Sequence, residues 1–394
     1  MWFTRPRSFI NAAVLSPGGE VFGSLRVHGT IIDSLGDAPD RRDVVIDLDG
    51  SVVLPGLINA HDHLELNSFG RLKWRDRYCN VSEWIADFQP RFAADPSLTA
   101  ARPETLDDRL WVGAFKNLLA GVTTVCHHNP LHTTLKRRYP VRVVRNYGFS
   151  HSLDIDGDEV AASHRRTPAN WPWIVHAAEG TDARAAAEID ALTSLGCVTP
   201  NTVIVHGVAL TPDSADKLLS RGGALVWCPT SNAFLFGRTA DVRQFDDAGR
   251  LAIGSDSRLS GEGDLLDEIR AAHATRQLTA DSLFHAATDG GARVLRLAEC
   301  GTLMPGCRAD LCVLRRNHAE PLDTLVTARR GDVRMTMVAG RALLSDPELS
   351  AVFESPHNAR AVIVDGARKL MDSKLARRAA TLKMHEAGLE VAPC

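Results

Sequence analysis

Short apolar runs that end in a polar residue recur along the middle of the chain. Seven of them have the length and composition of buried strands, at about residues 53–60, 122–126, 141–149, 172–176, 201–206, 223–228 and 251–255. Helical patterns lie between or after them, at about 106–119, 264–273 and 279–297. Polar groups at the carboxyl ends of successive strands are typical of the active face of a (β/α) barrel. The pattern therefore predicts an α/β barrel over residues 53–300.

Both ends of the chain have a different pattern. Residues 8–50 contain short runs of alternating apolar and polar residues, interrupted by Gly and Asp, and residues 301–345 show the same pattern. Alternation of apolar and polar positions suits antiparallel strands with one solvated face. We therefore expect residues 1–52 and 301–350 to form one small β-sandwich, with the barrel inserted between them.

The last segment, 351–394, is predicted to be a helical tail. Met371, Leu375, Ala379 and Leu382 recur there at helical spacing among basic residues. This pattern indicates an amphipathic helix on the body of the protein or on a partner subunit. A membrane-surface role is the weaker alternative, because the apolar face lacks Trp and Phe.

A long excursion, residues 64–103, follows the first barrel strand. It contains Trp74, Tyr78, Trp84 and Phe88. Long loops in compact domains often act as lids or binding loops, so we assign this segment to the mouth of a substrate site. A helix at 82–92, packed on the barrel by its aromatic side chains, is compatible with that assignment.

Length and composition limit the possible functions. The chain has 394 residues, enough for one large barrel and a smaller appendage. A net charge of −3 gives no basic surplus for nucleic acid. No run reaches the ~18 apolar residues of a membrane span, so we expect a cytoplasmic protein. Eight cysteines without a Cys-x-x-Cys pair favour free thiols.

Histidines and one aspartate follow the predicted strands. His61 and His63 are separated by one residue and would project to the same side of an extended strand. His176 and Asp256 end later strands. Neutral imidazoles with a carboxylate suit Zn²⁺ and also accept Fe²⁺ or Mn²⁺. A single one of these histidines could be an ordinary wall residue, but that interpretation does not account for all of them at strand ends.

In this combination the sequence resembles the amidohydrolase superfamily, in its mononuclear branch of cytosine deaminase-like, chlorohydrolase-like and adenosine-analogue deaminases. The matching motifs are His61-Asp-His63, His176-Ala-Ala-Glu179, His206-Gly, Cys228-Pro-Thr-Ser-Asn232, Gly254-Ser-Asp256-Ser and Asp264-Leu-Leu-Asp-Glu268. The resemblance covers roughly residues 8–345 and implies a (β/α)8 TIM-like barrel. Either an eighth strand lies between 150 and 171, or the barrel is truncated there.

The resemblance implies a hydrolase acting on C–N bonds, which deaminates an amino-substituted nitrogen heterocycle. His61, His63, His176 and Asp256 would hold the metal ion. Glu179 would protonate a ring nitrogen, Asp256 would transfer a proton from the attacking water, and His206 would orient that water. Capping of the helix that follows at Asp182 is the competing role for Glu179.

The absence of a lysine from one interval of the sequence predicts the number of metal ions. Many members of the superfamily hold two ions bridged by a carbamylated lysine. This chain has no lysine between Lys136 and Lys217, the interval in which that strand lies. We therefore expect one divalent ion per chain, with zinc preferred, and the family resemblance implies a homodimer.

Other possibilities stay open. The same chemistry could hydrolyse a cyclic amide or release another group such as chloride, and a non-catalytic ligand-binding barrel is the alternative of another class. Of the pair His127 and His128, one residue is expected to face the pocket and the other the wall, and a second metal site is the weaker alternative. The candidate substrate-binding residues are Trp74, His127, His151 and Asn232.

Overall fold

The middle of the chain forms two sheets of parallel strands. The computed structural model describes residues 5–16, 19–94, 105–137 and 139–391. One sheet contains three strands, in the order β5 (Leu57–Asp62), β6 (Val122–His127) and β7 (Arg142–Val143). The other contains five, β8 (Gly148–Ser150), β9 (Trp173–Ala177), β10 (Thr202–His206), β11 (Ala224–Trp227) and β12 (Leu251–Ile253). Most of their residues are buried, as expected when helices cover a parallel sheet.

Strands β7 and β8 belong to different sheets, although only residues 144–147 separate them. A parallel crossover needs a dozen or more residues. The two strands are therefore successive stretches of one passage, which pairs first with β6 and then with β9. This passage matches the single strand predicted at 141–149. Residues 151–171 contain α5 (Leu153–Asp156) and α6 (Glu159–Arg166) but no strand, so the alternative with a strand hidden there is wrong.

The carboxyl ends of the two sheets meet. The backbone N–H of Asp256, just after β12, donates to the carbonyl of His61 in β5 over 3.0 Å. The N–H of His128, just after β6, donates to the carbonyl of Asp62 over 3.0 Å. Polar residues from β5, β6 and β12 are therefore gathered at one edge.

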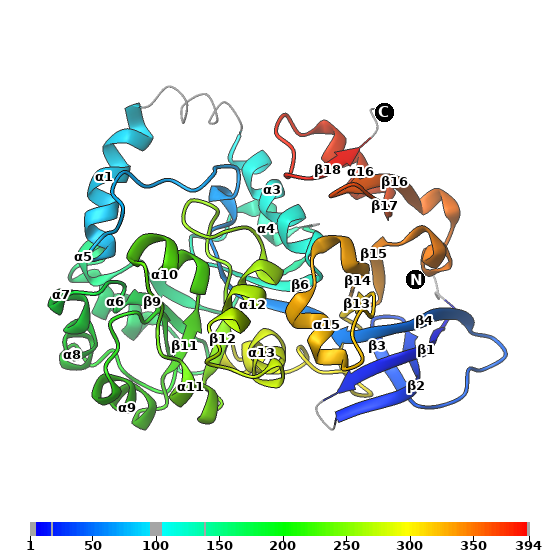
Figure 1. Ribbon diagram of the computed structural model, residues 1–394, viewed down its shortest axis with the longest axis horizontal. Helices are drawn as coiled ribbons and strands as arrows, with labels where there is room; N and C mark the ends of the chain where they lie inside the picture. Colours follow the sequence, from blue (N-terminus) through cyan, green and yellow to red (C-terminus); the bar gives the residue numbers. More distant parts are fainter. Residues whose placement is uncertain (1–4, 17–18, 95–104, 138, 392–394) are drawn as a thin grey trace.

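Helices lie around these strands (Figure 1). The predicted helix at 106–119 is confirmed as α3 (Leu106–Leu119), which Thr105 caps, and the predicted helix in the long excursion as α1 (Val81–Ala94). The segment expected to be helical at 279–297 contains α13 (Ala280–Ala287) and α14 (Asp289–Val294), separated at Thr288. Further α-helices among the described residues are α4 (Thr133–Lys136), α7 (Ala183–Ala186), α8 (Glu188–Ser194), α9 (Pro212–Ser220), α10 (Pro229–Phe236), α11 (Arg243–Asp247), α12 (Leu265–Ala274) and α15 (Pro321–Thr327).

Both ends of the chain join one mixed sheet of ten strands, on the right in Figure 1. Its order is β18-β16-β17-β15-β14-β13-β4-β1-β2-β3. The N-terminal strands are β1 (Arg7–Ser16), β2 (Gly19–His28), β3 (Ile31–Leu35) and β4 (Val44–Pro55), and the C-terminal ones begin with β13 (Leu311–Leu314), β14 (Val333–Val338) and β15 (Arg341–Ser345). Strands β4 and β13 pair antiparallel, so the predicted association of the two ends is confirmed. Their division into two packed sheets stays a prediction.

The prediction of a helical tail is wrong for most of residues 351–394. Strands β16 (Ala359–Val364) and β17 (Ala367–Asp372) form a hairpin, β18 (Leu389–Val391) adds a further strand, and only α16 (Ser373–Thr381) is an α-helix. The hairpin turns at Asp365-Gly366, both with positive φ, and Asp-Gly is a strong signal for such a turn. The helical spacing that included Met371 therefore crossed from a strand into a helix.

The described residues also bear on the cysteines and on membrane spans. The seven described cysteines are free, while Cys394 lies outside the described residues. No helix in the described part of the chain has the length and apolar composition needed to cross a lipid bilayer.

Candidate metal centre and active site

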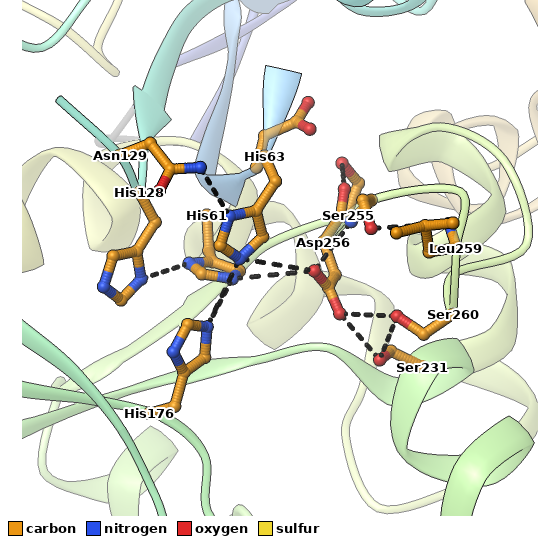
Figure 2. A network of polar contacts seen from close by, with 12 residues as sticks. His61, His63, His128, Asn129, His176, Ser231, Ser255, Asp256, Leu259 and Ser260 are labelled. Atoms are coloured by element: carbon orange, nitrogen blue, oxygen red, sulfur yellow. Dashed lines mark hydrogen bonds and ion pairs between the residues drawn. The ribbon is translucent and has the colours of Figure 1, made fainter. Parts of the chain in front are cut away.

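Three histidines and one aspartate converge at the carboxyl ends of the parallel strands (Figure 2). Nε2 of His176 lies 3.3 Å from Nε2 of His61 and 3.4 Å from Nε2 of His63. Asp256 Oδ1 lies 3.8 Å from Nε2 of both His61 and His63. The structure thus brings together the four residues predicted as metal ligands.

This arrangement fits a divalent cation. The donor atoms of a tetrahedral zinc site, each about 2.0 Å from the ion, lie roughly 3.3 Å from one another. The nitrogen separations match that value. Nδ1 of His176 lies 2.7 Å from the carbonyl oxygen of His151, which can only accept, so Nδ1 carries the proton and Nε2 presents a lone pair. Lone pairs that face one another repel, and a cation bound between them would stabilise this arrangement.

Burial keeps these imidazoles uncharged. It lowers the pKa of His61, His63 and His176, and the neighbouring histidines lower that of His61 and His176 further. Neutral imidazoles are the form that binds a metal ion.

Asp256 is held as a carboxylate. Its Oδ2 accepts hydrogen bonds from the hydroxyls of Ser231 and Ser260 at 2.7 and 2.8 Å, and its Oδ1 accepts from the Ser257 N–H at 2.7 Å. Burial favours the protonated form, but the nearby histidines and the Ser231 hydroxyl outweigh it and lower the pKa of Asp256 to about 2. The residue has φ 51°, a conformation uncommon outside glycine and found at functional sites.

Glu179 and His206 face each other beside the metal centre. Oε1 of Glu179 lies 3.5 Å from Nε2 of His206, and both side chains are buried. Burial and the Asp256 carboxylate raise the pKa of Glu179 well above its usual value, which favours the protonated form of its carboxyl group. The helix that follows is capped by Asp182, whose side chain accepts from the Ala185 N–H. The capping role considered for Glu179 thus belongs to Asp182.

A cavity of about 290 Å³ opens above this centre. Its floor includes His63, His176, Glu179, His206 and Asp256. Its walls are largely apolar, and they include Leu66, Val81, Trp84, Ile85, Phe88, Ile155, Leu235 and Leu259. Helix α1 supplies much of this lining, so the described part of the predicted 64–103 segment borders the cavity, while residues 95–103 lie outside the described residues.

The four candidate substrate residues occupy different places. His151 lines the cavity, and Asn232 lies behind it, where its Oδ1 accepts from Nδ1 of His206 at 2.9 Å. Trp74 is not among the described lining residues, because its ring packs under Arg91 at 4.9 Å. His127 is not among them either. Adjacent strand residues point to opposite sides, so His128 faces the histidines while His127 faces the wall.

Sequence reasoning missed a buried polar network behind the ligands. Lys116 in α3 is fully buried, and its Nζ lies 3.3 Å from the carboxylate of Asp62. Nζ also donates to Oδ1 of Asn67 at 2.8 Å and to the backbone carbonyl of Asp256 at 2.9 Å. The available signal was the polar pair Lys116 and Asn117 within an apolar stretch of the helix.

Comparisons with known proteins agree with this geometry. Residues 170–343 match the model of the amidohydrolase family. A 5-methylthioadenosine/S-adenosylhomocysteine deaminase of Natronomonas pharaonis is 27% identical over 376 residues, covering 78% of this chain and 84% of that protein.

Two solved structures with zinc have a similar fold. An adenosine deaminase of Xanthomonas campestris with bound zinc has a TM-score of 0.69 at 19% identity, covering 87% of this chain and 95% of that one. Atrazine chlorohydrolase of Arthrobacter aurescens TC1 complexed with zinc has a TM-score of 0.71 at 17% identity, covering 86% of this chain and 95% of that one.

Proposed function

The chain belongs to the amidohydrolase superfamily, and we propose that it is a metal-dependent hydrolase that deaminates an aminopurine or a related amino-substituted heterocycle. One observation carries this proposal. Glu179, whose buried carboxyl group has a raised pKa, lies beside three converging imidazole nitrogens and an ionised Asp256 at the floor of one cavity. The names of its relatives, which are deaminases of adenosine derivatives, support the substrate class.

His61, His63, His176 and Asp256 would hold one zinc ion. When bound, the ion supplies a water molecule whose pKa is lowered to about 7. The raised pKa of Glu179 favours its protonated form, which can donate a proton to a ring nitrogen. Oδ1 of Asp256 can accept a proton and pass it to the leaving amino group. His206 donates its Nδ1–H to Asn232, so its Nε2, which lies 3.5 Å from Oε1 of Glu179, presents a lone pair that can orient the attacking water.

The cavity suits an uncharged, flat substrate. Among the described lining residues there is no lysine or arginine, and the aromatic rings of Trp84 and Phe88 stack on each other with centroids 4.8 Å apart. Its volume is near the lower end of the range for small-molecule sites, about 300 Å³. Together with α1, these walls would exclude bulk water from the reacting atoms.

The finer architecture belongs to the same proposal. We infer that the parallel strands form one TIM-like barrel at 53–300 with seven passages, because β7 and β8 share a single one. The ends at 1–52 and 301–350 form the appended domain, and residues 351–394 extend it. A homodimer is the expected assembly, which light scattering would test.

An ammonia-release assay on protein loaded with one zinc ion tests the function. We expect release from 5-methylthioadenosine or adenosine, with a chloro-substituted purine included to detect chloride release. Metal content near one with no ammonia from any aminopurine would overturn the deaminase assignment.

A further inference from the structure

His128 lies directly behind one of the candidate metal ligands. Its Nδ1 is 3.2 Å from Nδ1 of His61 (Figure 2). Its Nε2 is 2.9 Å from the carbonyl oxygen of Ser150. We propose that His128 is a positioning residue that keeps the proton of His61 on Nδ1 and so directs the Nε2 lone pair of His61 toward the metal ion. This inference rests on the metal site of the proposed function.

The proton positions follow from the chemistry of the three groups. A carbonyl oxygen only accepts hydrogen bonds, so Nε2 of His128 must carry a proton. His128 is buried beside His61 and His176, with ring centroids 5.0 and 4.3 Å away, and an uncharged ring with Nε2–H leaves Nδ1 as an acceptor. The facing Nδ1 of His61 is then the donor. Its Nε2 is left with a lone pair, the form that binds a cation.

The fold holds the His128 ring in this orientation. Its backbone N–H donates to the carbonyl of Asp62, which ties the end of β6 to the end of β5. The ring lies nearly parallel to that of His176, with an angle of 6° between the planes. Ser150 ends β8, so the His128 side chain bridges the two parallel sheets where β7 gives way to β8.

His128 could instead be a fourth imidazole ligand, since the nitrogens of His61, His63, His128 and His176 lie within 4.8 Å of one another. The directions of its nitrogens argue against this role. Its Nδ1 meets the far side of His61, away from the Nε2 atoms on which His63 and His176 converge. Its other nitrogen is occupied by the Ser150 carbonyl.

The neighbouring His127 provides a matched control. It has no exposed surface, as His128 has almost none, but its Nδ1 faces the backbone N–H of Leu64 at 3.4 Å. Replacing His127 therefore perturbs the same buried segment without touching His61.

The experiment measures zinc affinity by competition with a chelator in His128→Phe, His128→Asn and His127→Phe. Loss of a group that orients a metal ligand typically weakens metal binding about 10- to 100-fold, which we expect for His128→Phe. Asparagine can place its amide oxygen near the former Nδ1, so His128→Asn should recover most of the affinity. His127→Phe should bind zinc as the unaltered protein does, and melting temperatures of the metal-free proteins report folding.

A second measurement does not depend on the variants. The ¹⁵N chemical shifts of the histidines in the zinc-loaded, unaltered protein should give Nδ1–H for His61 and Nε2–H for His128. The opposite assignment would overturn the inference, as would zinc affinity within threefold of the unaltered protein in His128→Phe. Loss of all bound zinc in both His128 variants would instead make His128 a direct ligand. If the unaltered protein binds no zinc, the proposed function itself fails.

Discussion

The two sides of the end of β5 differ in how their polar groups are satisfied. His61 and His63 point toward the candidate metal site, where uncharged imidazoles and one carboxylate converge. Asp62, between them, points to the opposite side and is surrounded by donors: Lys116 Nζ at 3.3 Å and the amides of Asn59, Asn67 and Asn117 at 3.2, 2.8 and 2.8 Å. We call the side of His61 and His63 the front and the side of Asp62 the back. The described residues at the front include no cation, whereas Lys116 provides one at the back.

This difference distinguishes the front residues, which we expect to act in function, from the back residues, which we expect to stabilise the fold. The back network is complete without any ligand, and it holds the Asp256 carbonyl and the strand residue between the two histidines in place. A cation at the front would have to come from solution. Changes in front should therefore alter metal binding and turnover, while changes behind should alter stability.

Removing a candidate ligand should have the largest effect. His176→Ala removes a nitrogen on which the Nε2 atoms of His61 and His63 converge. We expect bound zinc to fall from one per chain to near zero, with ammonia release lost. Elemental analysis and the release assay check this result. The exposed His273 on α12 supplies the control, because His273→Ala should change neither quantity. Full zinc content in His176→Ala would remove His176 from the ligand set.

Glu179→Gln should come next, with a loss of about 10²- to 10⁴-fold in kcat, because glutamine keeps the size of the side chain but cannot donate the carboxyl proton. Zinc content should stay near one. The matched control is Asp182→Ala, which removes the helix cap seen in the structure and should cost about 1 kcal/mol of stability with little change in kcat. Unchanged kcat in Glu179→Gln would leave the ring nitrogen without its assigned proton donor.

Behind the strand, Lys116→Met should act on stability. Breaking a buried ion pair by removing one partner typically costs about 3–5 kcal/mol, since the other charge stays buried and unpaired. Lys116 and Asp62 are both fully buried, so we expect a loss of this size in the free energy of unfolding measured with urea. A second change, Asp62→Asn, should recover part of it. A loss below about 1 kcal/mol would show that the pair contributes little.

The sequence predicted the front of the site better than the back. Strand ends and the i, i+2 spacing of His61 and His63 are local features, so the convergence of the candidate ligands could be anticipated. The partners of Asp62 come from α3, from the segment after β5 and from β5 itself, and their meeting depends on tertiary packing. A lysine on a helix gives no sign of the carboxylate it will meet.

The fold was predictable to a similar degree. Hydrophobic runs located the parallel strands, and the matching texture of both ends indicated their shared sheet. The prediction of a helical tail was wrong because Met371 and Leu375 have helical spacing although a strand ends between them at Asp372. The Asp365-Gly366 turn was the local signal that could have corrected this prediction.

The smallest effect is expected for a change at Glu188 in α8, whose pKa is raised like that of Glu179. Glu188 does not line the cavity, and its Oε2 accepts the backbone N–H of Ala178 at 2.6 Å. Burial raises the pKa of Glu188 to about 7 from 4.5 against the opposing effect of that hydrogen bond, with Asp154, Arg184 and Asp182 as the neighbouring charges. The native state therefore binds this proton more tightly than the unfolded chain.

The stability contributed by that proton is fully present below about pH 4.5 and is lost as pH rises through about 7. The shift corresponds to roughly 3 kcal/mol at most.

Glu188→Gln keeps an acceptor for the Ala178 N–H but cannot ionise. The difference in unfolding free energy between variant and parent should therefore grow in favour of the variant between pH 4.5 and 7 and then level off. Urea unfolding at several pH values measures this difference, and the exposed Glu159→Gln serves as the control. Glu188 lies outside the cavity, and its charge is the smallest of the causes that raise the pKa of Glu179, so kcat at pH 7 should change little in the variant. A pH-independent difference in stability would contradict the raised pKa of Glu188, whereas a large loss of kcat would mean that this glutamate acts on the reaction.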